Sequence, residues 1–128
     1  MIPIVFINCK EQPFLDQIMT GQKKYETRTR NMLHKLIGEK VLLAETGHGR
    51  APFVRAEATI DIGIEVFLRH VWETTYREPS CIAAGSKYDW QEGTKKKVLY
   101  LLKDVHPVKP FHAPEGIRHG RVWMEYNA

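Results

Sequence analysis

The 128-residue chain has few cysteines and no long apolar run. Its two cysteines, Cys9 and Cys81, lie far apart, which fits two reduced thiols better than a disulfide framework. The longest apolar runs, residues 2–7 and 98–102, are far shorter than the roughly 18 residues that a membrane-spanning helix needs. The N-terminal residues lack the positive region and the small-residue cleavage site of a signal peptide. We therefore expect a cytosolic protein with no membrane partner.

The usual motifs for metal ligands and for nucleophiles are also missing. The six histidines show no H-x-x-x-H or H-E-x-x-H spacing, and neither cysteine belongs to a C-x-x-C pair. Residues 46–50 (TGHGR) are glycine-rich but lack the G-K-[ST] of a phosphate-binding loop, and they are typical of a hairpin turn. No G-x-S-x-G elbow is present. The sequence therefore predicts neither a metal site nor a cofactor.

The composition is that of an ordinary globular protein with a mild positive charge. Apolar residues make up 43% and charged residues 27% of the chain, close to the averages for soluble proteins. A core of normal size can form within one domain, which we expect to span residues 1–128. The 19 basic and 15 acidic residues give a net charge of +4. That charge is compatible with a polyanionic partner but does not require one.

Hydrophobic periodicity predicts an α+β domain. Strands are expected at residues 3–8, 23–30, 39–45, 53–64, 95–105 and 121–126. A first helix is expected at residues 11–21, ending at Gly21, because its apolar stripe consists of Phe14, Leu15, Ile18 and Met19. A second helix is expected at residues 65–77 from the spacing of Phe67, Leu68, Val71, Trp72 and Tyr76. The prolines at 107, 110 and 114 predict an extended, turn-rich stretch. The sheet is expected to be a small curved or closed, mostly antiparallel β-barrel with two or three flanking helices.

One segment, residues 21–28, combines a glycine with charged residues at regular spacing. It reads G-x-K-x-x-E-x-R and follows the first expected helix directly. Gly21 permits a sharp turn with positive φ, and Lys23 at that turn can project its ammonium into a groove. Glu26 and Arg28 lie on one strand face and can pair, which would fix the guanidinium for a phosphate or a base edge. As a surface ion pair the same two residues would contribute only about 0–1 kcal/mol.

This segment resembles the signature of the ASCH domain family, whose members have a PUA-like fold, and the outline of the family extends over the whole chain. The resemblance implies a polar cleft that binds RNA, a nucleotide or a modified nucleoside. Lys24, Arg30 and Lys87 would then contact phosphates, and an aromatic ring could stack on an unpaired base. The expected binding residues are Gly21, Lys23, Lys24, Tyr25, Glu26, Arg28, Lys87, Tyr88 and Trp90.

Two of these assignments have structural alternatives. Tyr88 and Trp90, in the glycine-containing segment 85–93, can close the end of the barrel instead of stacking on a base. The lysines at residues 95–97 are expected to form the solvated start of a strand rather than a contact to a nucleic-acid backbone.

The resemblance also implies a possible enzyme. Some small ASCH proteins resemble amidohydrolases that remove the acetyl group of N4-acetylcytidine with a lysine, a threonine and a glutamate. Lys23 matches the lysine, but Glu26 replaces the threonine, and Thr27 would point to the opposite strand face. The glutamate is expected from the second helical region, as Glu65 or Glu73. Lys23 and Glu26 are thus the candidate catalytic residues. A ribonuclease is a third interpretation, with acid–base groups drawn from Lys23, Tyr25 and Glu26.

Overall fold

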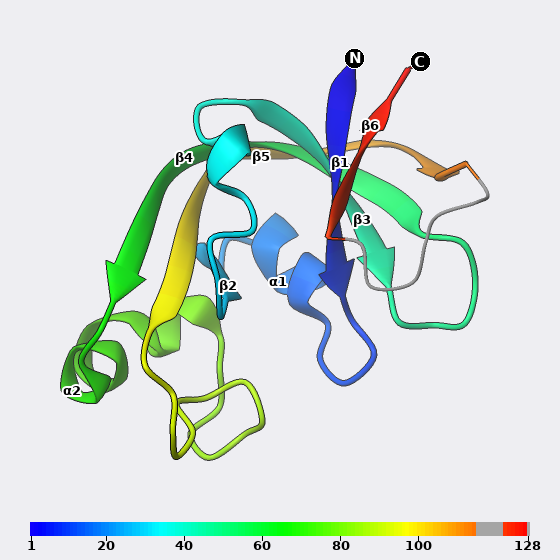
Figure 1. Ribbon diagram of the computed structural model, residues 1–128. Helices are drawn as coiled ribbons and strands as arrows, with labels where there is room; N and C mark the ends of the chain where they lie inside the picture. The colour runs from blue at the N-terminus through cyan, green and yellow to red at the C-terminus, as the bar shows by residue number, and fades with distance from the viewer. Residues whose placement is uncertain (115–121, 128) are drawn as a thin grey trace.

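The computed structural model describes residues 1–114 and 122–127 (Figure 1). One six-stranded sheet has the order β2-β5-β4-β3-β1-β6. Its strands are β1 (Ile2–Asn8), β2 (Tyr25–Arg28), β3 (Lys40–Thr46), β4 (Phe53–Val66), β5 (Lys97–His112) and β6 (Trp123–Tyr126). The helical elements are α1 (Phe14–Met19), η1 (His34–Leu36), α2 (Arg69–Val71), η2 (Trp72–Tyr76) and η3 (Glu78–Ser80). Within the described ranges no helix has the length and apolar character needed to cross a bilayer.

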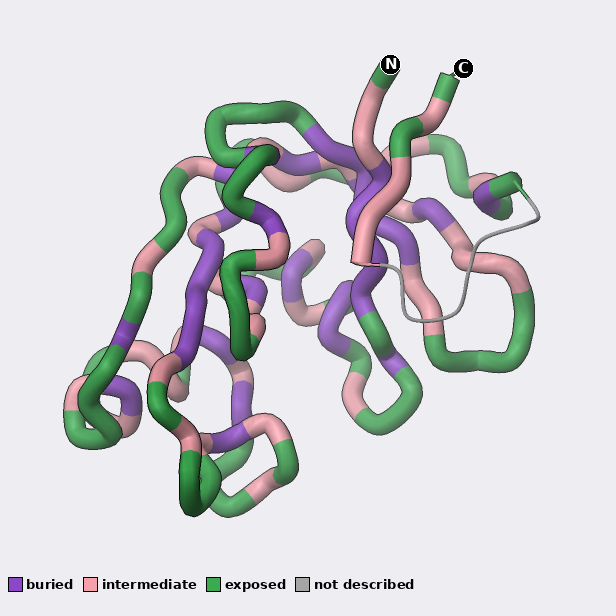
Figure 2. Tube along the Cα trace, in the orientation of Figure 1, coloured by how far each residue is buried: buried purple, intermediate pink, exposed green. Residues whose placement is uncertain are grey.

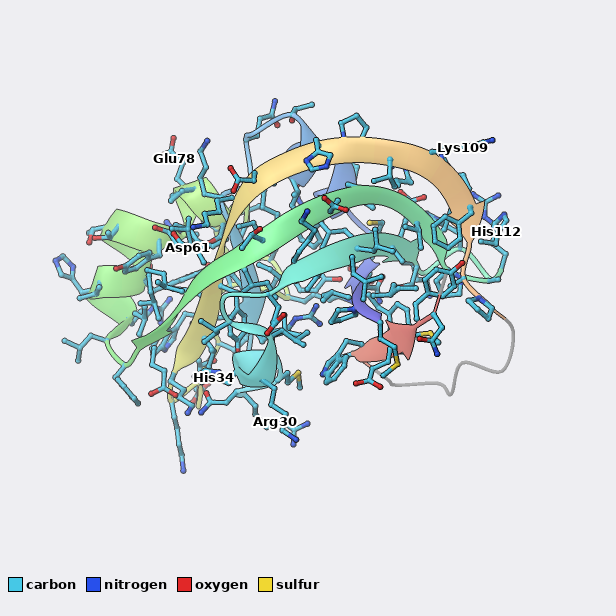
Figure 3. The ribbon with its side chains drawn as sticks, turned by 90° about the horizontal axis from the view of Figure 1, so that it is seen from above. Arg30, His34, Asp61, Glu78, Lys109 and His112 are labelled. Carbon is cyan, nitrogen blue, oxygen red and sulfur yellow. The ribbon has the colours of Figure 1, made fainter. Side chains whose placement is uncertain are left out.

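The sheet is mostly antiparallel and strongly curved, as expected, but it does not close into a barrel. Only the pairing of β1 with β3 is parallel among the described strand pairs. The long strands β4 and β5 bend together into an arch (Figures 1 and 3), and their register shifts at several bulges. Strands β2 and β6 form the two edges. We call the open side between β2 and the β1–β6 pair the seam.

A side-chain hydrogen bond bridges this seam. Arg28 on β2 donates from Nη2 to the carbonyl oxygen of Phe6 on β1, at 3.0 Å. On the β6 side, the Phe6 N–H donates to the carbonyl oxygen of Val122, at 3.0 Å. The seam is therefore held by a side chain rather than by a backbone ladder, which leaves room for a cleft.

The sheet is buried on both faces along β1, and this explains the apolar sequence of that strand. Successive side chains of a strand point to opposite faces. Val5 and Ile7 accordingly join the main core, which includes Trp72 and Tyr100, both 0% exposed. The alternate residues of β1 join a smaller core on the other face, made of Ile4, Phe6, Leu42, Ala44, Val54 and Ala113. Figure 2 shows these buried stretches following the strands, while the connecting loops are mostly exposed.

The first helix and the central hairpin are confirmed, although the helix is shorter than expected. Helix α1 buries Phe14, Leu15 and Ile18, and Gly21 follows it with φ +83°, the left-handed conformation expected at its end. Strands β3 and β4 form the antiparallel hairpin expected around residues 46–52.

The second helix is wrong in its first part. Strand β4 continues to Val66, and the helical segment begins only at Arg69, with one α turn followed by the wider turn η2. Phe67 and Leu68 are 60% and 65% exposed, so two residues of the expected apolar stripe do not enter the core. The strand expected at residues 53–64 from its period-two alternation is present and extends by two residues.

The proline-containing stretch after residue 105 is also part of the sheet. Strand β5 continues through Pro107 and Pro110 to His112. Strand β2 pairs with Val98–Leu101, and no other described strand pairs with that side of β5 beyond this point. Prolines are tolerated on such an edge and at the bulges of this strand.

A close approach between two loops gives a testable consequence at Gly47. Its φ is +97°, and a Cβ there would lie 2.7 Å from Asn8 Oδ1 and 2.8 Å from the backbone nitrogen of Lys10. We expect Gly47→Ala to lower the free energy of unfolding by about 2–3 kcal/mol, because backbone strain and a backbone clash add together. Gly49→Ala is the control, since Gly49 (φ +71°) has open space and carries only the strain of about 1 kcal/mol. Urea denaturation measures both, and equal losses would contradict the clash.

Candidate functional site

A cleft of about 280 Å³ lies at the seam. Its lining comes from β2 and the residues after it, from the loop that precedes β5, and from the residue before β6. The described lining residues include three cations and no carboxylate; they are Thr27, Arg28, Thr29, Met32, Lys87, Tyr88, Lys97 and Val122. Two of these cations pair with carboxylates outside the lining, Arg28 with Glu26 and Lys87 with Glu11, while Lys97 forms no ion pair with a described residue. A cation without an ion pair in a hollow attracts an anion. The cleft is therefore suited to an anionic ligand.

Lys97, at the start of β5, is buried, and the expectation of a solvated lysine run is wrong at this position. Its residue is 6% exposed, and Nζ donates a hydrogen bond to the carbonyl oxygen of Tyr88 at 2.6 Å. The ammonium also lies 5.3 Å from the centre of the Trp72 ring. Burial lowers the pKa of Lys97, and the charge of Asp89 partly offsets this. The other two lysines of the run are exposed or only partly buried.

Lys23 is a second buried lysine and does not project into an open groove as expected. It is 3% exposed, its Nζ donates to the carbonyl oxygen of Ser80 at 2.5 Å, and it lies 4.5 Å from the centre of the Phe14 ring. Burial lowers the pKa of Lys23, while the nearby charge of Glu26 opposes the shift. The lysine of the signature, Lys23, is therefore a buried amine on which the charge of the Glu26 carboxylate acts.

Glu26 and Arg28 pair as the sequence predicts. Glu26 Oε1 lies 3.5 Å from Arg28 Nη2, the nitrogen that also bridges the seam. Because Arg28 lines the cleft as well, it connects the cleft with the more deeply buried Glu26, which is 8% exposed. Among the described residues no partner is found for three buried atoms near this pair and Lys23: Glu26 Oε2, Arg28 Nε and Ser80 Oγ. Unpartnered buried atoms are rare in proteins, and a bound water, ion or ligand is one way to satisfy them.

The loop between η3 and β5 is organised around one buried carboxylate that sequence reasoning missed. Asp89 is 4% exposed and accepts hydrogen bonds from Trp72 Nε1 at 2.7 Å and from the backbone nitrogens of Gly85 and Trp90, both at 2.8 Å. Arg77 lies 3.4 Å from its second oxygen. Burial alone would raise the pKa of Asp89, but these donors together hold it below its usual value. This loop carries two of the cleft residues, so Asp89 positions them.

Those two residues, Lys87 and Tyr88, line the cleft. Lys87 is exposed and pairs with Glu11 at 2.7 Å, and its Nζ is 5.1 Å from the centre of the Tyr88 ring. Tyr88 packs edge-to-face against Phe14, with ring centres 5.2 Å apart. Tyr88 therefore both supports the core and offers part of its surface to the cleft.

The other expected binding residues are not among the described cleft-lining residues. Lys24 is exposed and follows the turn at Gly21. Tyr25 packs edge-to-face against Tyr76 at 5.5 Å, and Trp90 packs half-buried against the main core. Arg30 is exposed beyond the end of β2, near the η1 turn (Figure 3).

Glu65 and Glu73, the two candidates for a catalytic glutamate, form ion pairs with residues outside the described cleft lining. Glu65 pairs with Lys96 at 3.0 Å, and Glu73 pairs with Arg69 at 3.4 Å and Arg77 at 3.3 Å. Neither is a described residue of the cleft lining. The carboxylate whose charge raises the pKa of Lys23, against the effect of burial, is that of Glu26.

No cysteine or histidine is among the described residues that line the cleft. Both Cys9 and Cys81 are free thiols, as expected. His34 hydrogen-bonds to the Tyr100 hydroxyl at 2.7 Å, and His112 lies at the far end of β5 (Figure 3). Over residues 1–114 and 122–127 no group of three or more possible ligands could hold a metal ion.

Comparisons with known proteins agree at the level of the fold. No family model matches the sequence, and no curated protein matches it either. Among solved structures, the crystal structure of ASCH from Zymomonas mobilis has a TM-score of 0.75 and 18% sequence identity, covering 98% of this chain and 87% of that chain. Two variants of the Zymomonas mobilis protein, one Tyr-to-Phe and one Ser-to-Ala, each give a TM-score of 0.73, with 18% and 19% identity and 98% of this chain covered. They are covered over 89% and 87% of their own length. The chain therefore has the ASCH-type, PUA-like fold, with its curved sheet left open at the seam.

Proposed function

We propose that the protein is a member of the ASCH domain family that binds a nucleoside unit, free or within RNA, in the cleft at the seam. The observation that carries this proposal is the lining of the cleft, which contains the cations Arg28 and Lys97 together with the aromatic residue Tyr88. Cations that meet phosphate and rings that stack on bases are the two recurring elements of single-stranded nucleic-acid sites.

The buried pair behind the cleft supports recognition of a base. Arg28 lines the cleft as a donor, and the acceptor Glu26 lies behind it at 3.5 Å; Glu26 Oε2 and Arg28 Nε are buried and lack partners among the described residues. A base edge offers donors next to acceptors, such as the exocyclic amine of cytosine beside its ring nitrogen. The volume of about 280 Å³ is at the small end for ligand pockets. It suits one nucleoside unit rather than a duplex.

Binding of a fluorescein-labelled single-stranded RNA, followed by anisotropy, tests this function. We expect affinity to fall as salt rises, with a log–log slope of about 0.7 per phosphate contacted. Arg28→Met should weaken binding at least about ten-fold, because it removes a charged hydrogen-bond donor from the cleft. Arg69→Met, at an exposed arginine on α2, is the matched control and should bind like the unchanged protein.

Thermal unfolding of Arg28→Met separates lost binding from lost folding, since Arg28 also bridges the seam. Affinity that stays flat between low and physiological salt, or that survives in the folded Arg28 variant, would contradict the proposed site.

A second candidate function is hydrolysis of an acetylated nucleoside such as N4-acetylcytidine. The observation in its favour is Lys23, whose burial lowers its pKa beside the carboxylate of Glu26. A larger share of an amine with a lowered pKa is in the free-base form, which can accept a proton from water; the water then adds to the acetyl carbonyl, and the proton passes to the leaving nitrogen. The C–N bond breaks, releasing acetate and cytidine. Chromatography of the nucleoside products tests this candidate.

A further inference from the structure

Lys97 is a charge buried without a counter-ion close enough to pair with it. Lysines are almost never fully buried unless they are paired. In the described part of the chain no carboxylate lies within salt-bridge distance of Lys97, and its hydrogen-bond partner is the neutral carbonyl of Tyr88. The neighbouring Lys96 differs, because it reaches Glu65 at 3.0 Å. The fold therefore holds a cation at the cleft wall that forms no ion pair with a described residue, although the charge of Asp89 acts on it from beyond salt-bridge distance.

The cleft presents several hydrogen-bond donors with spare capacity next to this cation. An ammonium has three N–H donors, and Tyr88 uses one of those of Lys97. Arg28 also lines the cleft and carries five N–H donors, of which those on Nη2 face Phe6 and Glu26. Thr27 and Thr29 line the same cleft, and each carries a hydroxyl group. Donors around a buried cation match a group that is anionic and rich in acceptor oxygens.

We infer that Lys97, Arg28, Thr27 and Thr29 form a phosphate subsite, so that the cleft selects a nucleotide over the corresponding nucleoside. This inference rests on the proposed function and specifies its ligand. Phosphate supplies the missing negative charge to Lys97 and several acceptor oxygens to the surrounding donors. Tyr88, in the same lining, contacts the base while the phosphate occupies this subsite. Lys97 is then the residue that determines specificity for the phosphorylated ligand.

Calorimetric titration with cytidine, 5′-CMP, 3′-CMP, the dinucleotide CpC and inorganic phosphate tests the subsite. We expect the unchanged protein to bind at least one phosphorylated ligand ten-fold or more tighter than cytidine. Lys97→Met should bring the ratio of these two affinities close to one. Lys95→Met removes an exposed lysine two residues away and should leave the ratio unchanged. Preference for CMP assigns the subsite to a terminal phosphate, and preference for CpC assigns it to the phosphodiester of a strand.

Thr27→Val is a second variant that keeps the bond from Lys97 to Tyr88 and nearly the same shape. It should lower the nucleotide-to-nucleoside ratio several-fold, which keeps the test decisive if Lys97→Met does not fold. Equal affinities of the unchanged protein for cytidine and the phosphorylated ligands would overturn the subsite while leaving nucleoside binding intact. Binding of inorganic phosphate and CMP alike, with no contribution from the base, would support the subsite and overturn the proposed function. No binding of any ligand overturns both.

Discussion

Asp89→Ala is expected to lower the free energy of unfolding by about 3–5 kcal/mol. The carboxylate is 4% exposed and is the common acceptor for Trp72 Nε1 and for two backbone N–H groups. Removing it leaves the buried indole N–H of Trp72, two partly buried backbone N–H groups and the nearby Arg77 without their partner, and unpaired buried groups are costly. Urea denaturation followed by tryptophan fluorescence measures the loss directly.

The control for this prediction is Asp61→Ala. Asp61 lies on β4 in a partly exposed pair with Lys103, at 3.4 Å (Figure 3), and such pairs contribute about 0–1 kcal/mol. A loss below about 1 kcal/mol for Asp89→Ala as well would show that the loop does not depend on its buried carboxylate.

The same residue gives the protein a defined acid sensitivity. The pKa of Asp89 is lower in the folded protein than in the unfolded chain, where it is about 3.9. Its contribution to stability is therefore complete above that unfolded value and is lost as the pH falls through the lower folded value. Below about pH 4 we expect the stability difference between the unchanged protein and Asp89→Asn to shrink. A difference that stays constant from pH 6 to pH 2 would contradict the lowered pKa.

Lys23→Met is expected to reduce hydrolysis of N4-acetylcytidine by at least about 100-fold if the protein is an amidohydrolase. General acid–base groups contribute roughly 10²–10⁴-fold to rates, and Lys23 is the buried amine whose pKa is lowered beside Glu26. Methionine has a similar shape and removes the cost of burying a charge, while the Ser80 carbonyl loses its donor. The variant should therefore fold, which circular dichroism and urea denaturation check.

Lys24→Met is the matched control, because Lys24 is adjacent but exposed. It should retain the rate of the unchanged protein. A Lys23→Met rate within a few-fold of the unchanged protein would remove Lys23 from the chemistry. Absence of turnover by the unchanged protein at high concentration would rule out the second candidate function and leave nucleoside binding as the function to test.

Local patterns predicted the parts of the fold that depend on local geometry. Gly21 at the end of α1 has the positive φ that its position indicated, and the β3–β4 hairpin forms at the glycine-rich turn. The second helix failed because Phe67 and Leu68 are apolar yet exposed. A periodic pattern counts an exposed apolar residue in the same way as a buried one, and only tertiary packing distinguishes them.

The candidate site was predicted in part for a similar reason. The pairing of Glu26 with Arg28 follows from their spacing on one strand, and the structure has it. The burial of Lys97 could not be inferred from a run of three lysines, since it depends on a distant loop carbonyl at Tyr88. The role of Asp89 could not be inferred from the sequence either, because its donors, Trp72, Gly85 and Trp90, are brought around it only by folding.

The two buried lysines together hold the first half of the loop that forms one wall of the cleft, at its start and at its middle. Lys23 holds the chain at Ser80 and Lys97 holds it at Tyr88, each through a hydrogen bond to a backbone carbonyl. Because both lysines are buried, we expect residues 80–88 to unfold together with the main core rather than as a separate unit. A ligand that enters the cleft meets a wall that is already ordered. Its affinity is therefore not reduced by the entropy of ordering that wall. The amides of residues 80–88 should exchange slowly in the free protein and in the ligand-bound protein alike.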